Sequence, residues 1–358
     1  MKKQTLRRAA ALALCALLCL LPAAASGMGS FTTDGPYAPF SDLVPDGWYF
    51  DDVCTVRSLG IMDGKPGGLF DPMGSLSVAE AVTMAAKTRS IYAGGGFTPG
   101  GEPWYQNAVG YALSAGIVAA GQFTDYTRPA TRAEMAVLFA RALPAREYGR
   151  LNRVAAIPDV GADTAYADEI YLLYSAGVLT GDERGAFSPA AEVTRAEAAA
   201  IIGRAALPER RRSVNLSTPA AGIVEKTADF SVSLPAGWTR EDPADGYTQL
   251  YAQSADGGSN IYVLKYAKAD YPGADAAAVA GGFLNLQSAQ AGYALNEAPA
   301  DAIFRGLPGV AFSFTLTENG AVSLYRGYVV ENASAWFILL SGGASAGREV
   351  LYTLDLAL

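Results

Sequence analysis

The chain of 358 residues contains no histidine. Without an imidazole group it has no Ser-His-Asp or Cys-His nucleophile system, no histidine metal ligand and no histidine pH switch. An enzyme built from this sequence would depend on carboxylates, lysine, tyrosine or a hydroxyl group. Our leading interpretation has no catalytic residue, no bound metal and no cofactor.

Positive charge and long apolar runs are also scarce. The chain has 27 Lys and Arg against 35 Asp and Glu, a net charge of -8. Binding to phosphate backbones requires a basic face, so we expect no nucleic acid partner. The apolar run Ala9–Leu21 has 13 residues, whereas a membrane-spanning helix needs about 20. We therefore expect no membrane insertion of the mature protein.

This apolar run has the features of a secretory signal peptide. Two lysines and two arginines precede it, and Pro22 and small residues follow it, which is the order expected of such a signal. We predict a signal peptide over residues 1–26, a short N-terminal segment over 27–39, and a mature protein that is secreted. Only Cys54 would remain after cleavage, so no internal disulfide is expected, and Cys54 is predicted to be a buried helix residue.

Three related segments follow one another, over residues 40–92, 93–150 and 151–207. Each contains an aromatic residue, a glycine followed by isoleucine or valine, a proline, and finally a Ser/Thr-x-Ala-Glu motif. The closing glutamates are 54 and 63 residues apart. Such order indicates an internal repeat. The three closing motifs begin at Ser77, Thr131 and Thr194 and end at Glu80, Glu134 and Glu197.

Each copy is predicted to form a helix, a glycine-containing turn and a second helix. The Ser or Thr and the Glu three residues later form a capping box, in which hydroxyl and carboxylate satisfy backbone N–H groups at the helix start. Apolar residues then recur at helical spacing, as in Met135, Leu138, Phe139 and Ala142. One helix pair cannot bury such a stripe alone, so we expect the three copies to pack around a shared core.

The motifs Phe40-x-Asp42, Trp48-Tyr49, Gly60-Ile61, Phe70-x-Pro72 and Thr131-Arg132-Ala133-Glu134 resemble those of the S-layer homology domain in its usual set of three. The resemblance covers about residues 40–207. It implies an all-α, pseudo-threefold assembly that holds a secreted protein on the bacterial cell surface. The ligand it implies is an acidic secondary cell-wall polysaccharide, often pyruvylated, or peptidoglycan itself.

The resemblance also indicates which residues contact the wall polymer. Arg132 and Arg195 occupy the arginine place of the motif, where a guanidinium group at a helix start suits a carboxylate ligand. Trp48 and Trp104 occupy a tryptophan place, in which the ring packs either against a sugar or against the core. The candidate ligand-binding residues are Arg132, Arg195, Trp48, Trp104, Asp42 and Asp159. Since neither arginine is needed for a capping box, replacing both is expected to abolish wall binding without loss of helix.

Some positions depart from the pattern. Val78 stands in the arginine place of the first copy, and Tyr166 in the tryptophan place of the third. The second copy has Phe123-Thr124-Asp125 at its turn. We therefore expect one groove between copies to be lost or used differently.

The second half of the chain has a different pattern. Residues 208–222, with Arg210, Arg211 and Arg212, have the composition of a solvated linker. Beyond it, alternating apolar residues predict an α+β domain over residues 223–358 with an antiparallel sheet. Its layout resembles PsbP-like domains. The predicted strands are 230–234, 250–252, 260–267, 302–304, 309–318, 323–331 and 335–341, with helices at 274–291 and 346–356 and a hairpin turn at Asn319-Gly320.

These features together predict a wall-anchored protein that displays a C-terminal binding domain. One alternative is an enzyme that acts on wall polymers through carboxylates about 5 to 9 Å apart in a cleft. Another is a structural protein that assembles into a surface layer. The candidate carboxylates for the enzyme are Glu241, Asp242, Asp245 and Asp256.

Overall fold

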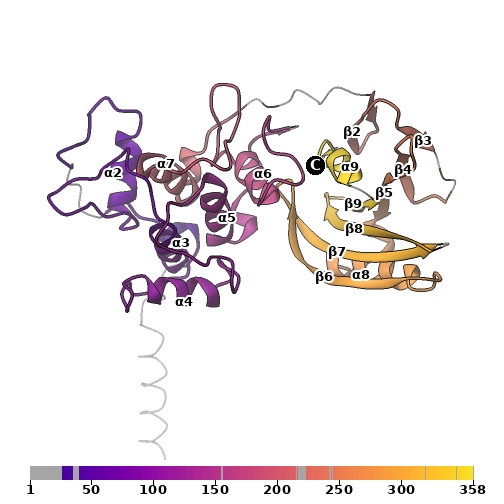
Figure 1. Cartoon of the computed structure of the whole chain (residues 1–358), viewed down its shortest axis with the longest axis horizontal. Helices are drawn as coiled ribbons and strands as arrows, with labels where there is room; N and C mark the ends of the chain where they lie inside the picture. Colours follow the sequence, from indigo (N-terminus) through magenta and orange to yellow (C-terminus); the bar gives the residue numbers. More distant parts are fainter. Residues whose placement is uncertain are drawn as a thin grey trace, which may run out of the picture.

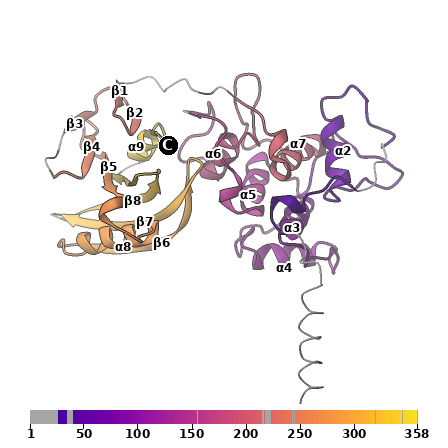
Figure 2. The same cartoon turned by 180° about the vertical axis from the view of Figure 1, so that it is seen from behind.

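The helices of the first half and the sheet of the second half occupy opposite ends of the molecule (Figures 1 and 2). In the computed structural model, the predicted signal peptide lies outside the described residues except for Ser26. No helix among the described residues is long and apolar enough to cross a membrane. The described residues are 26–34, 40–154, 156–214, 216, 223–241, 243, 245–318, 320–343 and 345–357.

Each of the three predicted repeats contains a pair of helices. In every pair the second helix begins with a complete capping box, as the sequence predicts. Cys54 lies in the first helix and is partly exposed, not buried as expected. The pairs are α2 (Phe50–Ser58) and α3 (Val78–Tyr92), α4 (Gln106–Ser114) and α5 (Arg132–Ala142), and α6 (Ala167–Ser175) and α7 (Arg195–Ala206), with 3₁₀ turns η1 (Met28–Ser30) and η2 (Ala145–Glu147).

The three second helices begin at one closed ring of backbone hydrogen bonds. Leu76 N–H donates to the carbonyl of Val193 at 3.1 Å, and Val193 N–H donates to Ala130 at 3.0 Å. Ala130 N–H donates back to Leu76 at 2.7 Å. All three side chains are fully buried. The repeats therefore meet at their centre through backbone contacts that fix the starts of α3, α5 and α7 relative to one another.

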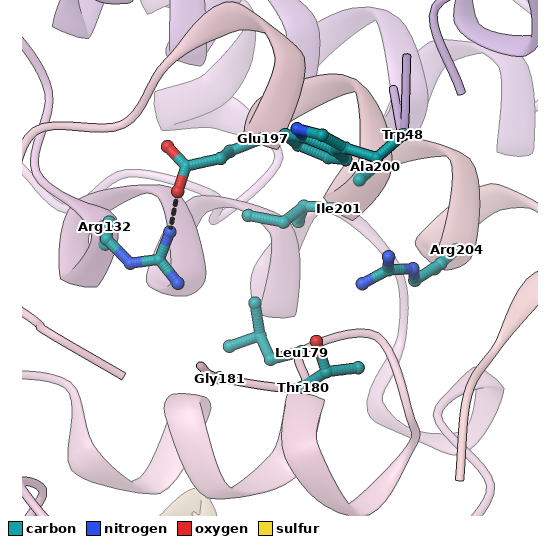
Figure 3. Close-up of a pocket in the computed structure, with 9 residues that line it drawn as sticks. All are labelled: Trp48, Arg132, Leu179, Thr180, Gly181, Glu197, Ala200, Ile201 and Arg204. Carbon is teal, nitrogen blue, oxygen red and sulfur yellow. Dashed lines mark hydrogen bonds and ion pairs between the residues drawn. The ribbon is translucent and has the colours of Figure 1, made fainter. Parts of the chain in front are cut away.

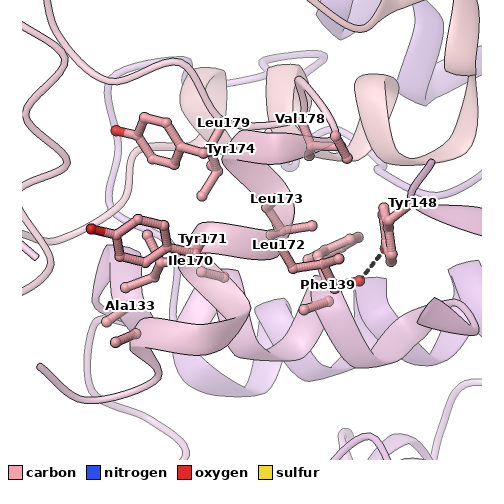
Figure 4. Close-up of a cluster of buried hydrophobic side chains, with 14 of the residues drawn as sticks. Ala133, Phe139, Tyr148, Ile170, Tyr171, Leu172, Leu173, Tyr174, Val178 and Leu179 are labelled. Carbon is pink, nitrogen blue, oxygen red and sulfur yellow. Dashed lines mark hydrogen bonds between the residues drawn. The ribbon is translucent and has the colours of Figure 1, made fainter. Parts of the chain in front are cut away.

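Figure 4 shows the part of the apolar core that surrounds α6 in the helical half. Ile170, Leu172 and Leu173 have no exposed surface. The hydroxyl of Tyr148 is also buried and donates to the carbonyl of Phe139 in α5. This core continues into the second half, where it includes Phe337 and Leu339.

The second half is an α+β domain with an antiparallel sheet, which confirms that prediction. Seven strands pair in the order β3-β4-β5-β9-β8-β7-β6, and β1, β2 and β10 form a smaller sheet. The 12-residue helix α8 packs on one face of the large sheet, and α9 packs on β5, β9 and β2. The strands are β1 (Ile223–Lys226), β2 (Phe230–Leu234), β3 (Thr239–Glu241), β4 (Thr248–Gln253), β5 (Ser259–Ala267), β6 (Ala294–Phe304), β7 (Leu307–Glu318), β8 (Ala321–Glu331), β9 (Ala335–Gly343) and β10 (Asp355–Leu356), and the helices are η4 (Lys268–Asp270), α8 (Ala276–Gln287) and α9 (Ser345–Leu351).

The strand predictions hold with changes at the ends. Strand β6 is much longer than the predicted 302–304, and β1 and β3 were not predicted. The final predicted helix is shorter, because the chain turns after Leu351 and pairs Asp355 and Leu356 with β2. In the predicted hairpin turn, Asn319 lies outside the described residues.

The predicted linker begins as part of the helical half. Pro208–Arg210 forms the 3₁₀ turn η3. Arg210 then donates to Asp52 of α2 at 2.7 Å. The guanidinium of Arg211 lies 5.6 Å from the ring centre of Tyr148 and donates to the carbonyl of Glu147. These two arginines are packed rather than fully solvated, because each finds a carboxylate, carbonyl or ring on the repeats.

The third repeat packs directly against the α+β domain. Arg305, in the turn between β6 and β7, is buried and donates to the carbonyls of Val154 and Leu354. Its guanidinium lies 5.0 Å from the ring centre of Tyr171. The carboxylate of Asp168 at the start of α6 accepts hydrogen bonds from the Tyr352 hydroxyl and the Arg305 N–H. Polar and apolar contacts therefore join the two halves.

Candidate ligand-binding groove

All three repeats contribute to one cavity of about 260 Å³ (Figure 3). Trp48 comes from the first repeat and Arg132 from the second. The third repeat supplies α7 and the glycine turn that follows α6. A ligand in this cavity would therefore contact all three copies. Its lining residues are Trp48, Arg132, Leu179, Thr180, Gly181, Glu197, Ala200, Ile201 and Arg204.

The two tryptophans are largely solvent-exposed. The side chain of Trp48 is 58% exposed and that of Trp104 is 52% exposed. Each ring makes an edge-on contact with the next residue, Tyr49 or Tyr105, at 5.5 Å between ring centres. Neither ring is therefore part of the core, and both are accessible at the surface.

Arg132 is held in place at the groove wall. Its Nε donates to the carbonyl of Phe187 at 2.7 Å, and its Nη1 donates to Glu197 at 2.6 Å. The guanidinium carbon also lies 5.0 Å from the Phe187 ring centre. Its Nη2 has no partner among the described residues, which leaves one fixed donor for a ligand.

Arg204 is a groove residue that the sequence motif did not indicate. Figure 3 shows its guanidinium pointing toward that of Arg132 across the cavity. Its Nε is buried without a hydrogen-bond partner, and its Nη1 donates to the carbonyl of Val178 at 3.3 Å. Burial lowers the pKa of Arg204 from its usual value, a cost that a bound anion would offset. The sequence does contain a signal for this residue, because a basic residue stands seven positions after each capping glutamate.

Arg195 lies inside the protein, with only 3% of its surface exposed. It donates through all three nitrogens, from Nε to the carbonyl of Phe70, from Nη2 to the carbonyl of Asp63 and from Nη1 to Glu80. Its guanidinium also lies 4.8 Å from the Phe70 ring centre. Arg195 thus joins the third repeat to the first and has no nitrogen left for a ligand.

Asp42 and Asp159 have the same position in two repeats and bind backbone of their own repeat. Asp42 accepts from the N–H groups of Phe70 and Asp71 at 2.8 and 2.7 Å. Asp159 accepts from Phe187 and Ser188 at 2.7 and 2.6 Å. Burial acts to raise the pKa of Asp42, but these backbone donors outweigh it and hold the pKa below its usual value. Both carboxylates shape the turn whose carbonyl receives Arg195 or Arg132.

An arginine from elsewhere replaces the one missing from the first repeat. Because Val78 stands in the motif place of the first repeat, that repeat supplies no arginine to Glu134 of the second repeat. Arg128, six residues before Glu134, donates to it instead at 2.9 Å. Each capping glutamate therefore has an arginine partner, which is Arg195 for Glu80, Arg128 for Glu134 and Arg132 for Glu197.

The carboxylates proposed for catalysis stabilise turns. Asp245 accepts hydrogen bonds from Thr248, and Asp256 accepts from Ser254 and Gly258. Hydrogen bonds from these hydroxyl groups lower the pKa of both carboxyls, whereas a general acid needs a raised one. Asp242 lies outside the described residues. Among the described residues, no group of three or more carboxylates or thiols could hold a metal ion.

Comparison with known families agrees with the repeat pattern. Residues 39–82 and 156–199 match the model of the S-layer homology domain. The chain contains S-layer homology domains. Over 177 residues it is also 28% identical to an amylopullulanase of Thermoanaerobacterium thermosulfurigenes, an alignment that covers 46% of this chain and 9% of that protein. The chain therefore spans less than a tenth of this relative's length.

Two solved structures align with about a third of the chain. One is a protein of Bacteroides thetaiotaomicron, with 13% identity over 36% of this chain and 45% of that chain, at a TM-score of 0.24. The other is LpqN of Mycobacterium tuberculosis, described as involved in cell envelope biogenesis, with 11% identity over 39% of this chain and 87% of that chain, at a TM-score of 0.29. Both scores are low, so neither assigns a fold to the second domain, and the PsbP-like resemblance stays a prediction.

Proposed function

We propose that this protein attaches non-covalently to the bacterial cell wall by binding an acidic wall polysaccharide in the groove between Trp48, Arg132 and Arg204. The observation that carries the proposal is the pair of guanidinium groups facing one cavity beside an exposed tryptophan (Figure 3). A carboxylate such as a pyruvyl ketal would bind the two arginines, and the sugar ring would pack on the indole.

The second segment, residues 93–150, belongs to the same proposal. It has the helix pair, the capping box and the place in the backbone ring that the two matching segments have. On this basis the three copies are related by an approximate threefold axis through the ring. Such an axis would place a corresponding groove at each of the three junctions between copies.

Charge distinguishes the groove of Trp48 from the other two. The basic residues equivalent to Arg204 are Lys87 and Arg141. Lys87 pairs with Asp63 at 3.0 Å, and Arg141 pairs with Glu169 at 2.7 Å. Arg204 has no carboxylate within 4.0 Å among the described residues. We infer that the groove of Trp48 is the main anion-binding groove, because its second cation is not neutralised by the protein.

The test is co-sedimentation of the purified protein with isolated cell walls. We expect binding to walls as isolated and loss of binding to walls stripped of secondary polymer by acid. Trp48→Ala is expected to weaken binding at least tenfold. Trp104→Ala, which removes a similarly exposed ring from a second groove, is the matched control and should bind as the wild type does.

Other outcomes contradict parts of this proposal. Binding that survives stripping would identify peptidoglycan as the ligand. Equal weakening by Trp48→Ala and Trp104→Ala would mean that both grooves contribute to wall binding. Absence of binding to both wall preparations would show that the repeats are a scaffold and not an anchor.

We further propose that the α+β domain is a binding module and not a catalyst. The turn-forming, ionised state of Asp245 and Asp256 supports this over the carboxylate enzyme. Assembly of the protein into regular arrays would favour the surface-layer alternative.

A further inference from the structure

A second cavity, of about 400 Å³, lies in the α+β domain between α8 and the end of β5. Tyr266 and Tyr271 form one wall, with their rings edge-on at 5.9 Å between centres. Val279, Phe283 and Leu286 of α8 form the other. Its size is within the range of small-molecule sites, which are mostly apolar.

The lining has no group that would hold a charged or strongly polar ligand. Among the described residues that line it there is no lysine, arginine, aspartate, glutamate or amide side chain, and the side-chain polar atoms are the hydroxyls of Tyr266 and Tyr271. Burial raises the pKa of Tyr266, so this hydroxyl is neutral at physiological pH. A sugar would leave most of its hydroxyls unpaired in such a cavity.

Gly282 lies in the middle of α8, where glycine lowers the stability of the helix. The packing of α8 does not require a glycine at this position. Glycine weakens a helix interior relative to alanine. A Cβ at Gly282 would meet no atom within 4 Å, so no close approach of another part of the protein explains it. Gly282 is exposed and lines the cavity. A large side chain at this position would therefore take up space beside the cavity.

Helix α8, which lines this cavity, carries no charged side chain after its N-cap residue Asp275. From residue 276 to 296 the chain contains no Lys, Arg, Asp or Glu. The side chain of Leu286 is 67% exposed and that of Tyr271 is 41% exposed. An exposed helix normally carries charged residues on its outer face, and clustered exposed apolar side chains indicate a binding surface. The uncharged and mostly apolar lining thus favours a hydrocarbon as the occupant.

We propose that this cavity binds a hydrocarbon chain of a single lipid or lipid-like molecule. The chain would lie between the tyrosine pair and Phe283, with Gly282 leaving room for it. A polar end would reach the mouth, near the Tyr271 hydroxyl. Each buried methylene adds to affinity through the hydrophobic effect.

The experiment is fluorescence titration of the purified protein with cis-parinaric acid, below the concentration at which it forms micelles. We expect saturable binding that decanol displaces and maltose does not. Gly282→Leu fills the cavity and should weaken binding at least tenfold. Gly281→Leu is the matched control, because its site is also exposed and free of neighbours but does not line the cavity. Both substitutions raise helix propensity, so neither should unfold the domain.

Three results would overturn the proposal. These are absence of saturable binding, displacement by maltose, and equal affinity of the Gly282→Leu and wild-type proteins. Flotation with neutral phospholipid vesicles is the companion measurement. If the protein binds vesicles but not cis-parinaric acid, the uncharged surface contacts a membrane and the cavity is not a lipid site.

Discussion

At the scale of single residues, the two motif arginines have different surroundings. Arg132 keeps one nitrogen for a ligand, whereas Arg195 is surrounded by Phe70, Asp63 and Glu80. Both arginines join neighbouring copies, but only Arg132 keeps a donor that faces the groove. The partners of Arg195 are more than 100 residues away in the sequence, and those of Arg132 are 55 and 65 residues away.

Replacing Arg195 with alanine should destabilise the protein. The change leaves Glu80 and two carbonyls without their partner, and breaking a buried ion pair costs about 3 kcal/mol. Urea unfolding followed by circular dichroism would measure this loss. The earlier expectation that both arginines could be removed without harm to the fold is therefore revised for Arg195. An unchanged midpoint for Arg195→Ala would mean that water replaces its contacts.

The roles of some residues could be predicted from the repeat pattern, and the roles of others could not. Asp42 and Asp159 stand at matching places in the repeat, so their similar geometry follows from the pattern. The substitution of Arg128 for the arginine missing at Val78 could not be predicted, because no motif position marks it. Arg204 could have been found by comparing the three second helices position by position.

At the scale of elements, the starts of the second helices were the most predictable feature. A capping box needs only four consecutive residues, so the sequence contains all of its information. Strand β3 has three exposed residues and therefore shows no apolar alternation. Strand β6 is mostly exposed along an edge of the sheet, which explains why only its buried end was predicted.

Removing one cap should weaken its helix by a predictable amount. The Thr194 hydroxyl accepts a hydrogen bond from the Glu197 N–H at the start of α7. Thr194→Ala should cost about 1 kcal/mol, whereas Thr194→Ser should be close to wild type because it keeps the hydroxyl. Chemical denaturation of the two variants side by side measures the difference. Equal stability of the two would show that the hydroxyl contributes nothing to α7.

At the scale of the whole molecule, the docking of the two halves was not predictable. It depends on Arg305 in a hairpin turn and on Asp168 at a helix start, and neither residue stands out in its local sequence. Contacts between positions more than 100 residues apart leave no periodic signal. The composition of residues 208–222 indicated a linker, but its first residues pack on the repeats.

This docking should depend on pH through Asp168. Burial raises the pKa of Asp168 to about 6, from a usual value of 3.8, against the hydrogen bond from Tyr352. A raised pKa means that the folded state binds the proton more tightly than the unfolded state. Protonated Asp168 therefore adds to the free energy of unfolding. This stabilisation is fully present below pH 4 and is lost as pH rises through 6.

Asp168→Asn tests this expectation, since an amide oxygen can still accept from Tyr352 and Arg305. The variant should gain about 2 kcal/mol relative to the wild type at pH 7.5 and little at pH 4. Thermal unfolding across this pH range gives the comparison. A stability difference that does not change with pH would contradict the titration of Asp168 in this window.

The contact between the third repeat and the sheet also fixes the orientation of the second domain relative to the first. Helix α7 lines the groove of Trp48, and α6 of the same repeat contacts the β6–β7 turn. A flexible tether would allow the second domain any orientation, whereas this packed contact holds it in one orientation relative to the groove. If the groove binds the wall polymer as proposed, the orientation of that polymer in the groove decides which face of the second domain points away from the wall.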